Sequence, residues 1–231
     1  MNQSKTNIAI SSQKTFFNRV FSWMTLGLLA TGVTSLYVAS SPALINFFLG
    51  NTIIFFGLII LQLFAVGMLA AKINSFSEQQ ASMIFLGYSI LNGITLSGLF
   101  LMYTGASIAL AFFITAGTFA TMTIYGYTTK SDLSEMGQLM FMGLIGIIIA
   151  SVINMFLKSE FMYWLISYAG VAIFIGLTAW DVQKLKLISQ NAASEEEHKK
   201  LAIFGALTLY LDFINLFILM LRIVGNRNRD F

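Results

Sequence analysis

The sequence predicts an all-α membrane protein built as a bundle of seven transmembrane helices. Of its 231 residues, 57% are hydrophobic and only 10% are charged, and its mean hydropathy is +0.80. Soluble domains contain about 25% charged residues, and a soluble fold of this size cannot hide so much apolar surface. The apolar residues also stand in long continuous runs, whereas a β-barrel shows short segments of alternating polarity.

A helix that crosses a bilayer needs about 20 predominantly apolar residues. Seven windows meet this requirement: 20–41, 52–71, 81–103, 106–127, 139–157, 161–182 and 201–222. The connections between them are short, so consecutive helices are expected to pack as antiparallel neighbours. We therefore interpret residues 20–231 as a single seven-helix transmembrane domain, in which we find no internal repeat.

The first window follows a polar and basic segment, residues 1–19, which we interpret as a cytoplasmic N-terminal tail. A cleaved signal peptide has an apolar stretch of about 7–15 residues and then a small-residue cleavage site. The run from 20 to 40 is longer and no such site follows it, so a retained first span is expected. The only proline, Pro42, falls in the next loop and therefore kinks no span.

Polar side chains within the second, third and fifth spans are expected to join helices to one another. Small and polar residues in membrane helices typically mark helix–helix contacts. Gln62, Asn92 and Asn154 are therefore each expected to form an interhelical hydrogen bond.

The last two spans each contain one aspartate, Asp181 and Asp212. An acid at the bilayer centre costs roughly 2.5–3.5 kcal/mol on insertion scales, so it faces protein, water or an ion and marks a functional site by default. Asp212 shares one helical face with Gly205, Thr208 and Asn215. Two structural alternatives stay open: Asp212 as a buried carboxylate paired only for stability, and Asp181 as a solvated acid at the cytoplasmic interface.

The spacing alone does not show that the two aspartates meet. Ser194 and Glu197 read as a capping box at the start of the last helix, which centres the turn near residue 192. Asp181 is then much closer to the turn than Asp212, and at about 1.5 Å per residue their depths differ by roughly 14 Å. A straight antiparallel hairpin would keep the two acids apart.

Lysine and arginine predict the orientation, because cytoplasmic loops are enriched in them. On the N-terminal side of a seven-span arrangement lie Lys5, Lys14, Arg19, Lys72, Lys130, Lys184, Lys186, Lys199 and Lys200. The other side has Lys158, Arg222, Arg227 and Arg229. A cytoplasmic N-terminus and an external C-terminus are therefore expected, with a re-entrant last segment as the alternative.

The sequence lacks the residues that several classes of function require. There is no cysteine, no P-loop motif and no H-E-x-x-H motif, and the only histidine, His198, lies in the charged segment SEEEHKK. No lysine lies inside a span, which argues against a retinal protein. The net charge of +3 and its distribution do not indicate nucleic-acid binding. We expect a protein that is not an enzyme and carries no cofactor.

Four segments resemble one known family. They are GALTLYLDFINLFILMLRIVGNR (205–227), GLTAWDVQKLK (176–186), YGYTTKSDLSEMG (125–137) and NGITLSGLF (92–100). The chain is similar over nearly its whole length to the Bax inhibitor-1, or transmembrane Bax-inhibitor-motif, family, and most of all to bacterial inner-membrane members.

The resemblance implies a seven-helix bundle with the last helix at its centre and a pH-sensitive calcium leak channel. It also implies that Asp181 and Asp212 share hydrogen bonds, sense protons and latch the pore. Two neighbouring carboxylates cannot both ionise cheaply, so such a pair responds to pH. The chain departs from the family at Trp180, where tyrosine is common, and at Lys72, where some members have an arginine that pairs with the two acids.

We therefore expect a pH-gated calcium leak channel of the inner membrane, with lipid, Ca²⁺ and protons as its partners. Asp181 and Asp212 would also bind the passing ion, since carboxylate oxygens suit Ca²⁺, and Thr208, Asn215 and Lys72 would line the path or pair with the acids. One rival is a regulatory protein whose tail 1–19 binds a membrane protease or another complex. A second rival is a proton-coupled carrier for a small solute.

Overall fold

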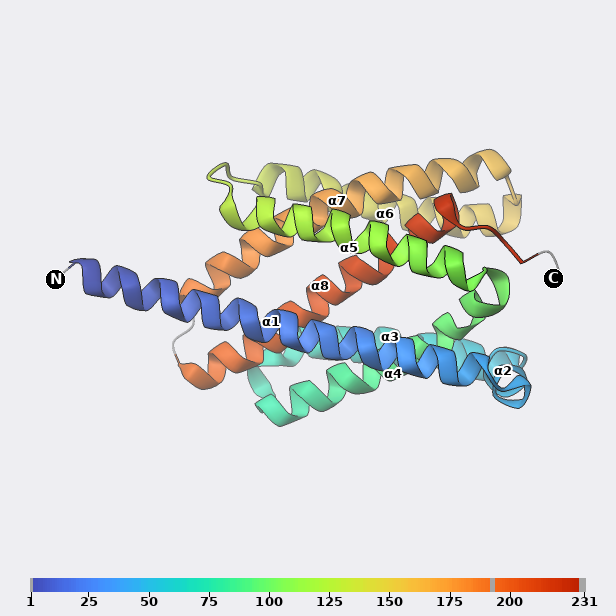
Figure 1. The fold of residues 1–231 in the computed structure, drawn as a ribbon, viewed down its shortest axis with the longest axis horizontal. Helices are drawn as coiled ribbons and strands as arrows, with labels where there is room; N and C mark the ends of the chain where they lie inside the picture. Colours follow the sequence, from blue (N-terminus) through green and yellow to red (C-terminus); the bar gives the residue numbers. More distant parts are fainter. Residues whose placement is uncertain (1, 192–193, 229–231) are drawn as a thin grey trace. The chain divides into compact units, whose positions relative to one another are not determined.

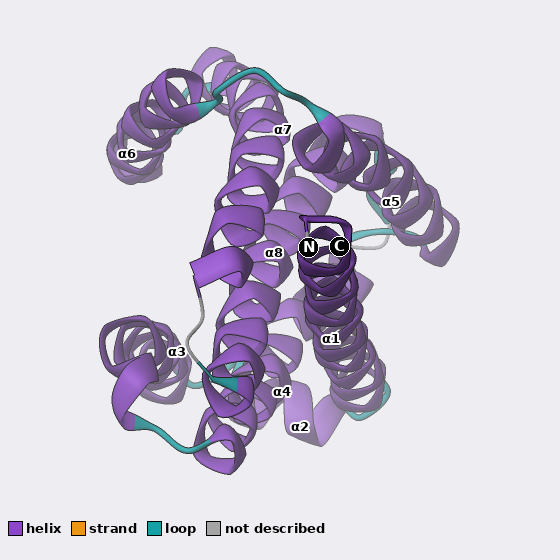
Figure 2. Cartoon of the chain, turned by 90° about the vertical axis from the view of Figure 1, so that its left-hand side faces the viewer, coloured by secondary structure: helices purple, strands orange, loops and turns teal. Residues whose placement is uncertain are grey.

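A computed structural model describes residues 2–191 and 194–228 of the chain, with side chains from Ser12 onward. These ranges hold eight α-helices and one short 3-10 helix (Figure 1). The elements are α1 (Asn2–Ala39), α2 (Pro42–Phe48), α3 (Thr52–Lys72), η1 (Ile73–Ser75), α4 (Glu78–Met102), α5 (Gly105–Thr128), α6 (Ser134–Leu157), α7 (Glu160–Asn191) and α8 (Glu195–Val224). Short loops join the helices, and the described residues form no β-strand (Figure 2). An isolated antiparallel bridge joins Tyr103 to Arg227.

Seven of the described helices are long and apolar enough to cross a membrane, which confirms the predicted fold class and number of spans. The helices extend beyond the predicted windows at the last connection. There, α7 continues to Asn191 and α8 begins at Glu195, so most of the predicted loop 183–200 is helical. The predicted loop 42–51 contains α2, which is too short to span a bilayer.

Local side chains explain where several helices begin and end. Ser41, Asn51 and Thr104 cap α2, α3 and α5, because each side-chain oxygen accepts a hydrogen bond from a backbone N–H of the first turn. The helix α6 ends where Lys158 adopts a left-handed conformation with φ of 50° and its N–H donates to the Asn154 carbonyl. These signals are short-range, so each of these four boundaries depends on residues close to it in the sequence.

The internal contacts group the chain into two units. Unit 1 comprises the described residues up to Met102, those of Leu187–Tyr210, and Asn228. Unit 2 comprises Tyr103–Lys186 and Leu211–Arg227. The helix α1 runs without a break from Asn2 to Ala39, so no change of secondary structure marks a boundary at residue 19. The division into a tail at 1–19 and one domain at 20–231 stays a prediction.

Within unit 1, α1 lies against α4 through a small residue. A Cβ atom at Gly93 of α4 would lie 2.6 Å from the backbone oxygen of Thr31, so the two backbones are in close contact. The Ser35 hydroxyl donates to the Gly93 carbonyl at 2.7 Å. This combination of a small residue and a short polar bond is typical of helix pairs in membranes.

Within unit 2, three glycines bring other helices against α7. Gly126 of α5 lies directly against the Ala179 carbonyl, and Gly137 of α6 lies against the Trp180 ring. Toward the other end of α7, Gly170 faces Leu219 of α8, beside an apolar cluster that includes Phe174. The α7 segment around Trp180 is therefore held from two sides by glycine contacts.

The helix α8 is the most buried of the seven spans. Of its most apolar window, 61% of the residues are buried, compared with 39% for α7 and 0% for α6. Residues of α8 up to Tyr210 belong to unit 1, and those from Leu211 belong to unit 2. The last helix is therefore the most enclosed of the described spans.

Candidate functional site

Unit 2 brings the two predicted aspartates together. Asp181 of α7 and Asp212 of α8 are both buried, with 7% and 5% of their surface exposed. Their carboxyl groups lie close enough to interact with each other. A hydrogen bond between two carboxyl groups needs a proton on one of them, because an ionised carboxylate only accepts. Two acids placed in this way can share one proton.

The contact depends on the register of α7 against α8. Asp212 is about two helical turns farther from the connecting segment than Asp181, which is roughly 10 Å along a helix. In unit 2, Asp181 nevertheless meets Asp212, and Gly170 meets Leu219. At the two acids, the pairing of the helices therefore differs from that of a straight hairpin, and this difference is what joins Asp181 to Asp212.

The cation beside the pair is Lys184, which the sequence analysis did not single out. Its Nζ lies 3.0 Å from Asp181 Oδ1, one turn along the same helix. The same Nζ lies 4.2 Å from the centre of the Trp180 ring, a cation–π distance. The spacing of three residues between Asp181 and Lys184 in WDVQK was the signal that could have revealed it.

The second acid has no such partner. Asp212 Oδ2 is buried and accepts no hydrogen bond from any described residue. A buried polar atom left unpaired costs about 1–3 kcal/mol, and more when it is charged. The pair is therefore asymmetric, with a cation on Asp181 and an unsatisfied oxygen on Asp212.

The other predicted site residues are placed differently. Thr208 and Asn215 donate to carbonyls of their own helix α8, those of Phe204 and Leu211, at 3.1 and 2.8 Å. Thr208 belongs to unit 1, whereas Asn215 belongs to unit 2 with the pair. Lys72 is exposed at the end of α3 in unit 1, and no ion pair of the described residues involves it. Their roles in an ion path stay predictions.

The pair offers two carboxylates to an ion and no further acidic or histidine ligand. The described residues contain no group of three or more His, Cys, Asp or Glu side chains that could hold a metal. Calcium sites in proteins commonly supply six to eight oxygens. Two carboxylates alone are thus too few to form a closed calcium site.

A second buried polar cluster lies in unit 1. The Tyr210 hydroxyl of α8 accepts from Asn92 Nδ2 of α4 at 2.8 Å and lies 2.6 Å from the Thr31 hydroxyl of α1. All three groups are buried and uncharged. Sequence reasoning missed Tyr210, because a tyrosine in an apolar run gives no signal of its hydrogen-bond partners.

Two of the three predicted interhelical hydrogen bonds are confirmed. Asn92 bonds to Tyr210 as described, and Gln62 of α3 donates to the Leu91 carbonyl of α4 at 3.0 Å. The prediction for Asn154 was wrong: its side chain accepts from the Ser159 N–H at 2.9 Å and closes the end of its own helix. The Asn154 oxygen thus satisfies a backbone N–H in the short connection between α6 and α7 and does not reach a side chain of another helix.

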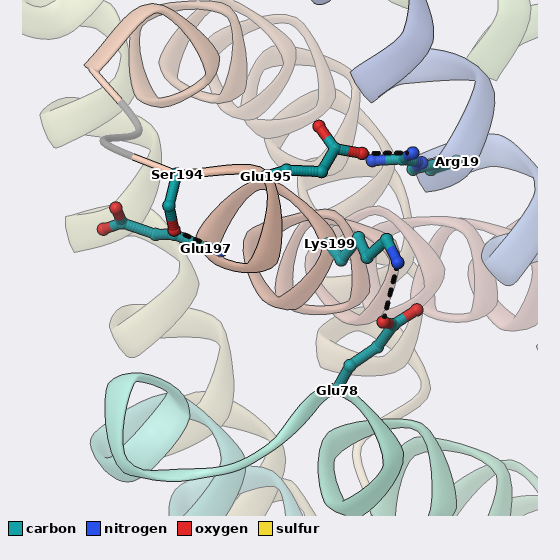
Figure 3. Close-up of polar contacts among 6 residues, drawn as sticks. All are labelled: Arg19, Glu78, Ser194, Glu195, Glu197 and Lys199. Atoms are coloured by element: carbon teal, nitrogen blue, oxygen red, sulfur yellow. Dashed lines mark hydrogen bonds and ion pairs between the residues drawn. The ribbon is translucent and has the colours of Figure 1, made fainter.

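The start of α8 is tied to α1 and α4 within unit 1 (Figure 3). The Ser194 hydroxyl accepts from the Glu197 N–H at 3.1 Å, which confirms the serine half of the predicted capping box. Arg19 pairs with Glu195 at 2.6 Å, and Lys199 pairs with Glu78 at 3.4 Å. One side chain of the predicted tail, that of Arg19, is thus engaged within the protein.

Comparison with known proteins gives one consistent family. Residues 13–229 match the family described as "Inhibitor of apoptosis-promoting Bax1". The inner membrane protein YbhL of Escherichia coli K12 is 49% identical over 216 residues, covering 93% of this chain and 92% of that protein. Uncharacterised proteins of Borreliella burgdorferi and Rickettsia prowazekii are 42% and 41% identical and cover 100% and 97% of this chain, and 99% and 98% of their own. The chain therefore belongs to the Bax inhibitor-1 family.

Proposed function

We propose that this membrane protein is a non-enzymatic, pH-sensitive leak pathway for cations, calcium in particular, gated by Asp181 and Asp212. The observation that supports the proposal most is the contact between these two buried carboxyl groups on membrane-spanning helices. Acids at such positions are rare and commonly serve ion or proton paths. The Escherichia coli relative, inner membrane protein YbhL, supports placement in the inner membrane.

A shared proton would hold the pathway closed. With one proton between them, the two carboxyl groups attract each other and keep α7 against α8. When the pH rises and this proton leaves, two negative charges face each other in a poorly hydrated site and repel. The helices then part, and a hard cation offsets the exposed charge. At low pH both acids carry protons, the anionic ligands are lost and the flux falls.

The proposal also includes an orientation, with the N-terminus in the cytoplasm and the C-terminus outside. Seven spans put the two ends of the chain on opposite sides, and the lysine and arginine bias selects the direction. Reporter enzymes fused after residue 231 should be active only outside the cytoplasm. A C-terminal reporter active in the cytoplasm would contradict the orientation.

Calcium flux into proteoliposomes, measured with an enclosed dye across a range of pH, tests the proposal. Flux through the wild type should rise with pH, whereas Asp212→Asn should flatten the profile because it removes one titrating group. The matched control is Asp132→Asn, the same change in the loop after α5. Hydrogen bonds from Ser134 hold the pKa of Asp132 below its usual range, so this exposed acid stays ionised throughout.

Two results would contradict the proposal. One is a wild-type flux equal to that of empty liposomes at every pH. The other is an Asp212→Asn protein that keeps the wild-type profile, since the aspartate pair would then not be the sensor.

A further inference from the structure

We propose that Arg222 and Arg227, gathered around Tyr163, bind the headgroup phosphate of an anionic phospholipid. The site lies within unit 2, where the last turn of α8 and the segment after it meet the first turn of α7. It is separate from the aspartate pair, and it does not depend on the proposed leak pathway.

Two positive charges surround one aromatic ring. The Arg222 guanidinium lies 5.7 Å from the centre of the Tyr163 ring, and the Arg227 guanidinium lies 5.9 Å from the same centre. Arg227 Nη2 also donates a long hydrogen bond of 3.5 Å to the Tyr163 hydroxyl. The electron-rich face of a ring attracts a cation but carries no net charge. The tyrosine therefore brings the two arginines together without neutralising them.

Backbone contacts fix the position of Arg227, although it follows the end of α8. The Arg227 backbone forms the antiparallel bridge with Tyr103. The preceding residue, Asn226, donates its N–H to the Ser107 hydroxyl at 2.9 Å, and its carbonyl accepts from the Thr104 N–H at 3.3 Å. A cation that is already held in place loses less conformational freedom when it binds a ligand. Arg227 is thus prepared to bind an anion.

The described residues supply no acid to these arginines. Neither Arg222 nor Arg227 takes part in a described ion pair. The charged residues just before Tyr163 are Lys158 and Glu160, both exposed, so three described cations face one acid at this end of unit 2. A guanidinium that lies over a ring keeps its in-plane N–H donors available, and two of them match the oxygens of a phosphate. An anion with such oxygens would offset the excess charge.

The aromatic side chains next to Tyr163 indicate the depth of the site in the membrane. The Trp164 ring contacts the Tyr163 ring edge-on with 5.6 Å between centres, and it stacks on Tyr168 at 5.9 Å. Trp164 and Tyr168 are 36% and 57% exposed. Exposed tryptophan and tyrosine residues at the ends of membrane spans gather at the level of the lipid headgroups. The arginines beside them therefore lie where lipid phosphates are found.

The excess charge selects the class of lipid. Phosphatidylcholine carries a cation next to its phosphate, which the two arginines would repel, whereas phosphatidylglycerol carries only the negative charge. A free phosphate ion offers the same oxygens but has no acyl chains to contact the exposed rings of Trp164 and Tyr168. We therefore assign the site to a lipid with net negative charge, and free phosphate becomes an outcome of the test.

Trp164 can report the binding by fluorescence. In a Trp23→Phe, Trp180→Phe background it is the only tryptophan left of three. The protein is placed in phosphatidylcholine vesicles that contain phosphatidylglycerol brominated on its acyl chains, and brominated phosphatidylcholine at the same fraction sets the baseline. The extra quenching gives the preference for phosphatidylglycerol. This preference should be at least about fivefold, and Arg222→Gln combined with Arg227→Gln should bring it close to one.

The matched control is Lys158→Gln, which removes a positive charge from the same end of unit 2 but not from the ring of Tyr163. It should keep most of the preference. Replacing both Arg222 and Arg227 by lysine keeps the charge but loses the paired N–H donors, so an intermediate preference is expected. Should the Trp180→Phe protein fold poorly, the natural tryptophans are kept and Trp164→Phe protein supplies the background signal.

Three results would overturn the lipid site. They are a wild-type protein without preference, a double glutamine variant that keeps the preference, and a Lys158→Gln protein that loses as much as the double variant. Inorganic phosphate, exchanged for chloride at constant ionic strength, should leave the quenching unchanged. If it abolished the preference, the arginines would bind free phosphate and the assignment to a lipid would be wrong.

Discussion

Two nearby residues of α8, Tyr210 in unit 1 and Asp212 in unit 2, have opposite hydrogen-bonding environments. In unit 1, Tyr210 is buried, uncharged and fully hydrogen-bonded to side chains of α1 and α4. In unit 2, Asp212 is buried, contacts another acid and retains an oxygen without a partner. One helix thus carries a satisfied polar cluster and an unsatisfied one, only two residues apart.

This difference indicates which cluster is structural. Hydrogen bonds between uncharged groups in membrane proteins contribute about 0.6 kcal/mol on average, so the Tyr210 cluster resembles ordinary helix pairing. A carboxylic acid in the same setting is expensive and is commonly kept for function. Unit 1 is therefore expected to respond to mutation through stability, and the aspartate pair of unit 2 through the pH dependence of transport.

The largest effect should come from the two aspartate substitutions, made singly or together. Asp181→Asn and Asp212→Asn should each remove most of the pH dependence of calcium flux, and the double variant should add little to either. Coupled groups give non-additive effects, whereas independent sites add. Flux in proteoliposomes across pH measures this cycle. Additive effects would show that the two acids act separately and would remove the contrast between the units.

The next largest effect is expected from a substitution that overpacks unit 2. Gly126→Ala places a methyl group against the Ala179 carbonyl next to Trp180, and should lower the free energy of unfolding by about 1–3 kcal/mol. Gly117→Ala is the matched control on the same helix, because no atom lies within 4 Å of its added Cβ. Thermal unfolding in detergent compares them, and an equal loss in both variants would contradict the close contact.

A smaller effect is expected for the polar cluster of unit 1. Tyr210→Phe removes the hydroxyl that joins Thr31 to Asn92, and should destabilise the protein by about 1 kcal/mol while leaving the pH profile of flux unchanged. Tyr125→Phe provides the control, since Tyr125 is 45% exposed. A changed pH profile in Tyr210→Phe would mean that the unit 1 cluster also takes part in gating.

The smallest effect should follow loss of a surface ion pair in unit 1. The side chains of Lys199 and Glu78 are 39% and 41% exposed, so Glu78→Gln should change stability by at most about 0.5 kcal/mol. The change should disappear at high salt, because exposed charges are screened. A salt-independent loss would indicate that this pair does more than join two solvated ends of helices.

Much of the fold could be predicted because its signals are local. Seven apolar runs predicted seven spans, and Ser194 predicted the start of α8. Hydrophobicity along the chain decides insertion into a bilayer, and a cap requires only residues three or four positions apart. The prediction for Asn154 was wrong because the sequence does not show whether the asparagine forms a hydrogen bond with another helix or with the residues just after its own helix.

By itself, the sequence determined the class of protein, the family and the two unusual acids, since composition and motifs belong to the chain before it folds. Only the tertiary structure decided that Asp181 meets Asp212, because a helix pair can adopt many registers and the contact needs a shift of roughly 10 Å. It also decided that Lys184 on Trp180 faces the pair, through the room that Gly137 leaves for the ring. Side-chain contacts between helices depend on packing in three dimensions, which spacing along one helix does not contain.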